Sequence, residues 1–166
     1  PVTAVKRLSE WASDELIYLD ISKNDEYDIR RDDQGYQNRG SFLDIIEDVS
    51  KVTFMPITVG GKIRTLQDIE ARLKVGADKV TLNTMAIDRI EFIEEAAKQF
   101  GSQCIVVSID AKKTTGGYKV FRNGRSEQTQ FSPDELAHQV EEQGAGEILI
   151  NSIDNDGVGN GYDIGL

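Results

Sequence analysis

The sequence has little cysteine and histidine and fewer basic than acidic residues, and these features exclude several classes of protein. Its one cysteine, Cys104, cannot form an intrachain disulfide, which fits a reducing compartment. There is no cluster of His and Cys to hold a zinc ion. No apolar run is long enough for a transmembrane helix, and no targeting or lipidation motif is visible. We therefore expect a cytoplasmic protein without a metal or other cofactor.

Acidic residues outnumber basic ones by 29 to 19, so the net charge is −10 at pH 7. This balance argues against nucleic acid or an anionic membrane as the main partner. It does not exclude a phosphorylated substrate, because helix N-termini and backbone amides bind phosphate locally whatever the net charge. With 166 residues, the chain is expected to form one domain, residues 1–166, with a core of its own.

Apolar segments with strand character alternate with amphipathic helical segments along the chain. Strands that alternate with helices form a parallel sheet with right-handed crossovers, so we expect an α/β fold. A mostly polar segment, residues 112–130, is expected to form a small hairpin or excursion. Strands are predicted at residues 14–21, 54–61, 78–83, 104–111 and 148–150, and helices at residues 5–12, 42–51, 65–76, 88–100 and 132–144.

Residues 22–41 are almost wholly polar and charged, and we expect them to form a long loop. A loop of this length without secondary structure is uncommon and is usually functional or disordered. Two interpretations stay open, a lid over a site and a mobile surface loop.

Three of the predicted strands repeat one pattern. Residues 14–20, 78–83 and 146–151 align with one another and lie two strand–helix units apart each time. In a (β/α)8 barrel, alternate strands contribute inward residues to the same layer. This favours a barrel over an open sheet and predicts one charged layer near the barrel floor. Its members are Glu15, Lys79 and Glu147, while Asp20, Asn83 and Asn151 are expected near the opposite rim.

Polar side chains follow two of the predicted strands at the point where each strand ends. Asn151, Asp154 and Asp156 come after the apolar run at residues 148–150, and Asp110 ends the strand at residues 104–111. This is the pattern of a parallel strand, covered on both faces, whose C-terminal end carries the functional loop. Simpler alternatives are a structural carboxylate at Asp110 and capping of the following turn by Asp154 and Asp156.

Four motifs together resemble the cyclase subunit of imidazole glycerol phosphate synthase, a family of (β/α)8 barrels. The motifs are Pro-Ile-Thr-Val-Gly-Gly at residues 56–61 and the segments at residues 76–84, 100–112 and 144–157. The resemblance runs through the whole chain, in the family's order and at nearly its spacing. It implies an enzyme that receives ammonia from a glutaminase partner. The reaction joins ammonia to a phosphorylated ribulosyl precursor, closes the imidazole ring and releases an aminoimidazole carboxamide ribotide.

The resemblance also assigns roles to residues of this chain. It implies that Asp110 is a catalytic general acid and base, which the chemistry supports because ring closure requires proton transfers. It implies that Glu15, Lys79 and Glu147 form a gate for ammonia, although an internal ion network is an equally simple interpretation. The residues expected to bind the substrate and its phosphates are Gly61, Asn83, Thr84, Asn151, Asp156 and Gly157.

Several features depart from the family pattern. The first family strand, with the other catalytic aspartate, has no counterpart here, and the seventh and eighth strands are also absent. We therefore expect about five of the eight β/α units, as a partial barrel, from either an excerpt or a truncated relative. Lys62 stands where the family has a third glycine in a phosphate-contacting loop. Its ammonium can attract an anion, but its bulk removes a close approach of the backbone.

Two further hypotheses about function stay open. Asn151 replaces a threonine that is common in the histidine enzyme, and Phe54 precedes Met55 and Pro56. These residues resemble a paralogous group associated with amidation of surface-polysaccharide sugars, whose members also pair with a glutaminase-like subunit. The third hypothesis is a non-catalytic barrel fragment that oligomerises or binds phosphate.

If the chain is a naturally short relative, we expect it to self-associate, because a partial barrel leaves open strand edges that another copy can cover. Sedimentation at micromolar concentration measures this directly. A stable monomer would contradict the expectation.

Overall fold

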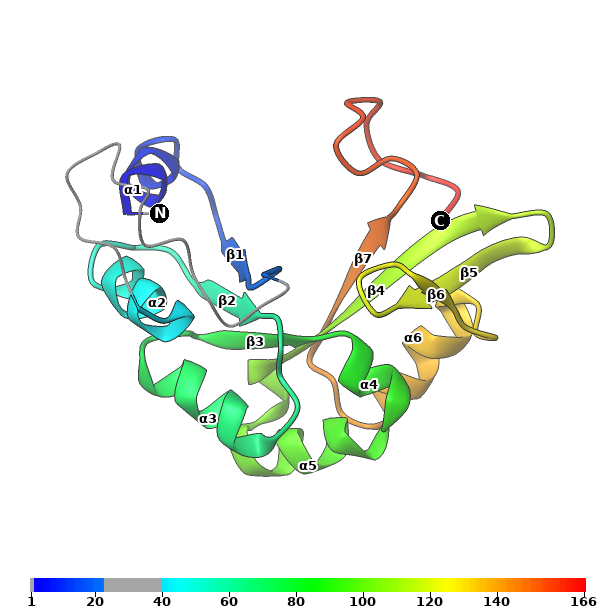
Figure 1. Ribbon diagram of the computed structural model, residues 1–166, viewed down its shortest axis with the longest axis horizontal. Coiled ribbons are helices and arrows are strands. Elements are labelled where there is room, and N and C mark those ends of the chain that lie inside the picture. Colours follow the sequence, from blue (N-terminus) through cyan, green and yellow to red (C-terminus); the bar gives the residue numbers. More distant parts are fainter. Residues whose placement is uncertain (1, 23–39) are drawn as a thin grey trace. The chain divides into compact units, whose positions relative to one another are not determined.

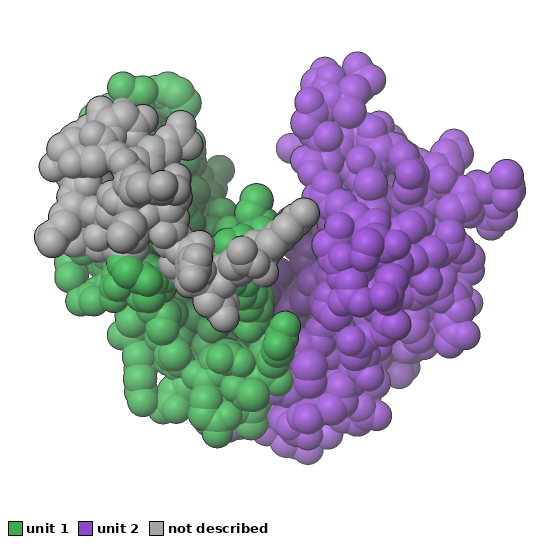
Figure 2. Space-filling view, in the orientation of Figure 1, with its two compact units in different colours: residues 1–80 green, residues 81–166 purple. Residues whose placement is uncertain are grey.

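The structure, a computed structural model, describes residues 2–22 and 40–166. The chain divides into two compact units, residues 1–80 and 81–166 (Figure 2). Most of the loop predicted at residues 22–41, namely residues 23–39, lies outside the described residues, so its role stays a prediction. Within the described ranges, no helix has both the length and the apolar character needed to span a bilayer.

The first unit contains two parallel strands joined through a helix. It contains α1 (Val2–Glu10), β1 (Leu16–Leu19), α2 (Phe42–Ser50), β2 (Ile57–Gly60) and α3 (Leu66–Lys74) (Figure 1). β1 and β2 are parallel neighbours, with Leu16 opposite Ile57 and Leu19 opposite Gly60. Parallel neighbours need a crossover connection, and the chain between these two strands includes α2. The division between the two units falls inside β3 (Lys79–Leu82).

The second unit is organised around β4. Its elements are α4 (Thr84–Asp88), α5 (Glu91–Phe100), the 3-10 turn η1 (Ser102–Cys104), β4 (Ile105–Thr114), β5 (Gly117–Arg122), β6 (Glu127–Gln128), α6 (Pro133–Glu142) and β7 (Glu147–Ser152). β7 lies parallel to β4, with Val106 opposite Glu147 and Asp110 opposite Asn151. β5 pairs antiparallel with the C-terminal half of β4, residues 110–114, and β6 pairs antiparallel with β5. This confirms the predicted hairpin and the predicted alternation of strands with helices.

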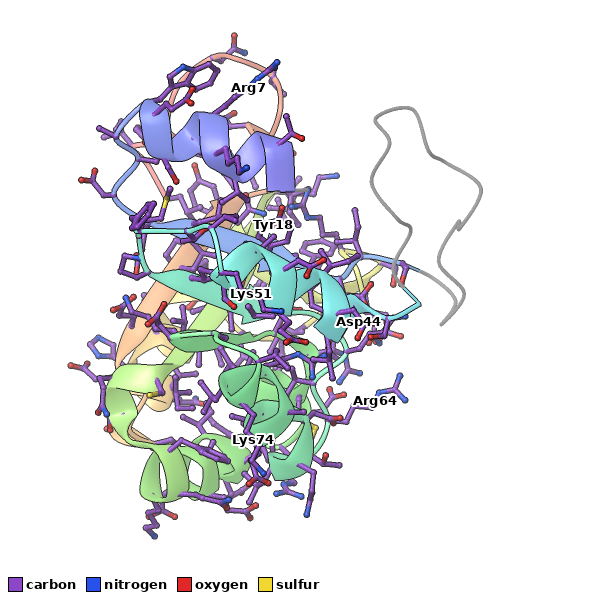
Figure 3. All side chains as sticks on the ribbon, turned by 90° about the vertical axis from the view of Figure 1, so that its left-hand side faces the viewer. Arg7, Tyr18, Asp44, Lys51, Arg64 and Lys74 are labelled. Atoms are coloured by element: carbon purple, nitrogen blue, oxygen red, sulfur yellow. The ribbon has the colours of Figure 1, made fainter. Side chains whose placement is uncertain are left out.

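The core of the first unit is formed by apolar residues of α1, α2 and β2. Val5, Ile46, Val49, Ile57 and Val59 pack in one cluster, and Tyr18 of β1 packs against it (Figure 3). Burial raises the pKa of the Tyr18 phenol. The side chains of Lys51, directly after α2, and of Lys74, in α3, are exposed instead (Figure 3). These two lysines pair with glutamates one turn away, at 2.9 and 2.7 Å.

The second unit buries the apolar faces of α5, α6 and β4. Both helices contact β4, whose residues Ile105, Val107 and Ile109 are fully buried. The faces that α5 and α6 turn inward carry Phe92, Ile93, Leu136 and Val140. Alternate residues of a strand point to opposite faces, so Asp110 points to the face opposite the buried face that carries Ile109.

Three helices begin with capping boxes, which local sequence determines. Thr65 accepts a hydrogen bond from the backbone of Asp68, and the Asp68 carboxylate accepts in return from the backbone of Thr65. Ser132 and Glu135 do the same for α6, which confirms the start predicted from Ser132. The start predicted at Asp88 is wrong. Asp88 ends α4 and binds Arg122, and α5 begins at Glu91.

The expectation that β7 is covered on both faces is also wrong. Ile148 and Ile150 share one face and are 38% and 44% exposed. Among the described strands β7 pairs only with β4, so its other edge has no neighbouring strand in the described chain. An apolar run reveals the tendency of a strand to be buried, but not which segment covers it.

Gly61 allows the end of β2 to approach the end of β1 closely. Its φ is +94°, and a Cβ built there would lie 2.3 Å from the backbone oxygen of Asp20. The Asp20 amide donates to the carbonyl oxygen of Gly60 at 2.9 Å, which extends the β1–β2 pairing to this point. Only glycine fits such a position without moving one of the two backbones.

Replacing Gly61 with alanine should therefore destabilise the fold. The left-handed backbone alone costs a non-glycine residue roughly 1–2 kcal/mol, and the contact with Asp20 adds to it. Chemical denaturation should show a fall of about 2 kcal/mol or more in the free energy of unfolding. Gly116→Ala is the matched control, because a Cβ there meets nothing within 4 Å. Equal stability of the two variants would contradict this account of Gly61.

Candidate functional site

The carboxylate of Asp110 lies at the centre of a polar cluster in the second unit. The side-chain amide of Asn151 donates to its Oδ1 at 2.8 Å, and the amide of Asn83 donates to its Oδ2 at 3.2 Å. The side chain is 15% exposed, so these bonds satisfy it while leaving part of it accessible. A carboxylate that accepts an amide hydrogen bond on each oxygen has a fixed orientation.

Strand register places Asn151 beside Asp110. The two residues lie opposite each other in the parallel β4–β7 pair, so their side chains leave the same face at the same height. Asn83 reaches the cluster from the end of β3, where the chain turns into α4. Its amide also donates to the carbonyl of Ser108 at 2.9 Å, and its own oxygen accepts from the hydroxyl of Thr84 at 3.3 Å. These bonds orient the Asn83 amide toward Asp110.

Arg125 also contacts this cluster, although it was not among the site residues predicted from the sequence. Its Nε lies 3.5 Å from Oδ1 of Asp110, and its Nη1 donates to Oδ2 of Asp156 at 2.7 Å. Arg125 follows the turn Asn123-Gly124, and these three residues have φ values of 51°, 64° and 69°. Asn-Gly is a strong hairpin signal, and it was the one clue in the sequence to a turn here.

The acidic loop after β7 contacts the hairpin through both of its first two carboxylates. Oδ2 of Asp154 accepts from the backbone N–H of Lys113 at 2.9 Å, and Asp156 binds Arg125. In the described chain, these carboxylates therefore connect the loop after β7 to β4 and to the β5–β6 turn. The simpler alternative predicted that they cap the turn in which they lie. Gly157 follows with φ +74°, and a Cβ there would meet nothing within 4 Å, so its backbone is open.

A second set of hydrogen bonds holds the far end of this loop. The hydroxyl of Tyr118 donates to Oδ1 of Asp163 at 2.9 Å, and the hydroxyl of Ser152 donates to Oδ2 at 3.0 Å. The bond to Asp163 raises the pKa of the Tyr118 phenol, and the same bond lowers the pKa of the Asp163 carboxyl. Residues 153–163 are thereby held at both ends against the strands that present Asp110.

Gly61 and Lys62 lie in the first unit, beside the end of β1. Nζ of Lys62 donates to the hydroxyl of Ser22 at 2.9 Å and lies 3.6 Å from Oδ2 of Asp20. Lys62 has φ +54°, a left-handed conformation that glycine adopts more readily than lysine. Its ammonium contacts Asp20 and Ser22, and the anion-binding role expected for it stays a prediction.

The predicted charged layer is found in part. Lys79 forms an ion pair with Glu15, and both residues belong to the first unit. Glu147 begins β7 in the second unit, opposite Val106. Its membership of the same layer stays a prediction. Within residues 2–22 and 40–166, no three His, Cys, Asp or Glu side chains converge as metal ligands would.

Comparisons with known proteins match the whole chain. The family model described as "Histidine biosynthesis protein" matches residues 1–166. The chain is 45% identical to the imidazole glycerol phosphate synthase subunit HisF of Campylobacter concisus, over 100% of this chain and 62% of that protein. It is 43% identical to the HisF subunit of an Exiguobacterium species, over 100% of this chain and 61% of that protein. The HisF subunit of Natranaerobius thermophilus is 42% identical over 163 residues, 98% of this chain and 61% of that protein.

The chain thus spans 61–62% of the length of these curated relatives. The matches extend over both compact units, including the strands that carry Asp110 and Asn151.

Replacing Tyr118 with phenylalanine should loosen the loop that carries Asp156 and Gly157, because it removes the hydrogen bond to Asp163. Backbone amides of residues 153–165 should exchange with deuterium faster, while those of α5 remain protected. Tyr162→Phe is the control, since Tyr162 is 94% exposed. Equal exchange in the two variants would show that the Tyr118 bond does not hold the loop.

Proposed function

We propose that this chain, which belongs to the histidine biosynthesis protein family, carries the reaction centre of a cyclase/lyase. Its fold is an α/β fold of the (β/α)8-barrel type, present in part. The proposed enzyme uses ammonia to convert a phosphorylated ribulosyl precursor into imidazole glycerol phosphate and aminoimidazole carboxamide ribotide. The relatives named above as subunits of imidazole glycerol phosphate synthase support imidazole glycerol phosphate as a product. Because the chain spans part of their length, the proposal concerns the full protein that contains it.

Asp110 is the proposed general acid and base, and its surroundings carry the proposal. The strand was predicted to end at this residue, but β4 continues to Thr114 and Asp110 lies within its C-terminal half. Its carboxylate is oriented by the amides of Asn83 and Asn151 and is still partly exposed. Ring closure needs a proton removed at one atom and supplied at another. A carboxylate fixed within hydrogen-bond reach of the substrate can make both transfers.

The phosphates of the substrate are proposed to bind on the two sides of Asp110. On one side lie Asn83 and Thr84, at the start of α4, where backbone N–H groups of the first helical turn can donate to a phosphate. On the other side lies the loop with Asp156 and Gly157, whose open backbone at Gly157 permits a close approach. Gly61 is proposed to contribute its backbone, and Asn151 its amide, to substrate binding.

Ammonia is proposed to come from a glutaminase subunit, through a gate formed by Glu15, Lys79 and Glu147. The ion pair between Lys79 and Glu15 supports a gate, because the attraction between two opposite charges can hold a passage closed and is reversible. Opening would require only that the Lys79 ammonium exchange one carboxylate for another.

Amidation of a surface-polysaccharide sugar precursor is the alternative that Asn151 suggested, and the relatives named above support the first function over it. This residue, where threonine is common in the histidine enzyme, donates directly to the proposed catalytic carboxylate. The two functions differ in their substrate. Turnover of the ribulosyl precursor with ammonia by the full protein supports the first function. Absence of turnover, with Asp110 intact, would exclude it.

Replacing Asp110 with asparagine should lower kcat by roughly 10²–10⁴-fold, the usual contribution of a general acid or base. The asparagine keeps the size of the side chain, so circular dichroism should show an unchanged fold. Glu141→Gln, which removes one exposed carboxylate from α6, is the control and should keep full activity. Retained activity in the Asp110→Asn variant would remove Asp110 from the mechanism.

A further inference from the structure

The turn between β5 and β6 lies against both groups of proposed phosphate-binding residues. The backbone N–H of Asn123 donates to the hydroxyl of Thr84 at 3.1 Å. Two residues later, the guanidinium of Arg125 contacts Asp110 and Asp156. The turn therefore joins the start of α4 to the loop after β7, across the carboxylate between them. Neither the sequence motifs nor the proposed roles account for this arginine.

Charge makes a direct role for Asp156 in phosphate binding unfavourable. A carboxylate and a phosphate dianion repel each other, and Asp110 adds a second negative charge nearby. A cation between the phosphate and these two carboxylates would offset the repulsion. Arg125 is the cation in contact with both, at 2.7 Å from Asp156 and 3.5 Å from Asp110.

The guanidinium keeps hydrogen-bond donors for a further partner. It has five N–H groups in a planar fork. In the described chain, Nη1 is used by Asp156 and Nε faces Asp110, while Nη2 has no hydrogen-bonded partner. The side chain is 37% exposed, so the remaining donors can be reached from solvent. A fork held on one side by carboxylates is suited to bind phosphate oxygens in pairs on the other.

We propose that Arg125 is a phosphate-binding residue of this site, and that Asp156 acts through it by holding the guanidinium in position. The phosphate is that of the substrate that docks beside Gly157, so the proposal rests on the phosphorylated substrate of the proposed function. The role of Asp156 changes accordingly, from a ligand of the phosphate to the support of its ligand.

The alternative is that Arg125 only holds the hairpin in place. Other contacts also hold the hairpin, so a change at Arg125 can distinguish a structural role from phosphate binding. Arg122 ties β5 to α4 and β6 through Asp88 and Glu127, and Asn123 binds Thr84. These contacts stay when Arg125 is changed. Arg122 also provides a matched control, because its side chain is 37% exposed, like that of Arg125, and it pairs with two carboxylates away from Asp110.

The test compares Arg125→Gln, Arg125→Lys and Arg122→Gln with the parent, in the full protein titrated with inorganic phosphate. Amide signals of Gly157 report binding at this loop by nuclear magnetic resonance. A charge-assisted hydrogen bond is worth a roughly 10- to 100-fold change in affinity, so Arg125→Gln should weaken binding at Gly157 by that factor. Arg125→Lys should lie between, since an ammonium keeps the charge and loses the fork. Arg122→Gln should bind as the parent does.

The role of Asp156 has a test of its own. Asp156→Asn should weaken phosphate binding in the parent and have no further effect in the Arg125→Gln background, because the two residues act as one unit. Tighter binding in Asp156→Asn alone would show that the carboxylate only repels the anion. Unchanged binding in Arg125→Gln would overturn the proposal.

Turnover separates this proposal from the proposed function. With the ribulosyl substrate and ammonia, Arg125→Gln should raise KM by a similar factor and change kcat less. If the parent does not turn this substrate over, the proposed function fails, and the phosphate titration still decides the role of Arg125.

Discussion

The hydrogen bonds from two asparagine amides to Asp110 are the interaction on which the candidate site depends. They require Asn151 to lie opposite Asp110 in the parallel β4–β7 pair, and Asn83 to stand at the start of α4. They also require the buried face of β4, because Val107 and Ile109 point into the core and leave the opposite face for polar side chains. A slip of one residue in this pairing would turn Asn151 away from Asp110.

The excess of negative charge in the chain is managed locally at this site. Asp110, Asp156 and Arg125 form one group in which a single guanidinium serves two carboxylates. The neighbouring Asp154 and Asp163 accept hydrogen bonds from neutral donors, namely the Lys113 backbone and the hydroxyls of Tyr118 and Ser152. Neutral donors and one arginine thus stabilise an acidic loop within an acidic protein. This arrangement makes it physically reasonable for an anionic substrate to approach.

Local features of the fold were predictable from the sequence, and features that depend on distant contacts were not. Thr65 with Asp68 and Ser132 with Glu135 specify helix starts within a few residues. The repeat in the strands correctly indicated that Asn83 follows β3 and that Asn151 lies near the end of β7, whereas the strand end predicted at Asp110 is wrong because β4 continues to Thr114. Their mutual hydrogen bonds depend on register, which the repeat only implied. Arg125 escaped prediction because its partner Asp156 is 31 residues away, and the Asn-Gly signal indicates a turn without showing where the next side chain points. The exposure of Ile148 and Ile150 escaped because apolar character does not reveal what covers a strand.

A crystal structure of the full protein with a bound unreactive analogue of the phosphorylated ribulosyl precursor tests the central claim most directly. The account predicts an Asp110 carboxylate oxygen within about 2.6–3.2 Å of the group that exchanges a proton, or one water away from it. Both asparagine amides should still contact the carboxylate. An analogue bound elsewhere, with Asp110 remote from every reacting atom, would contradict it.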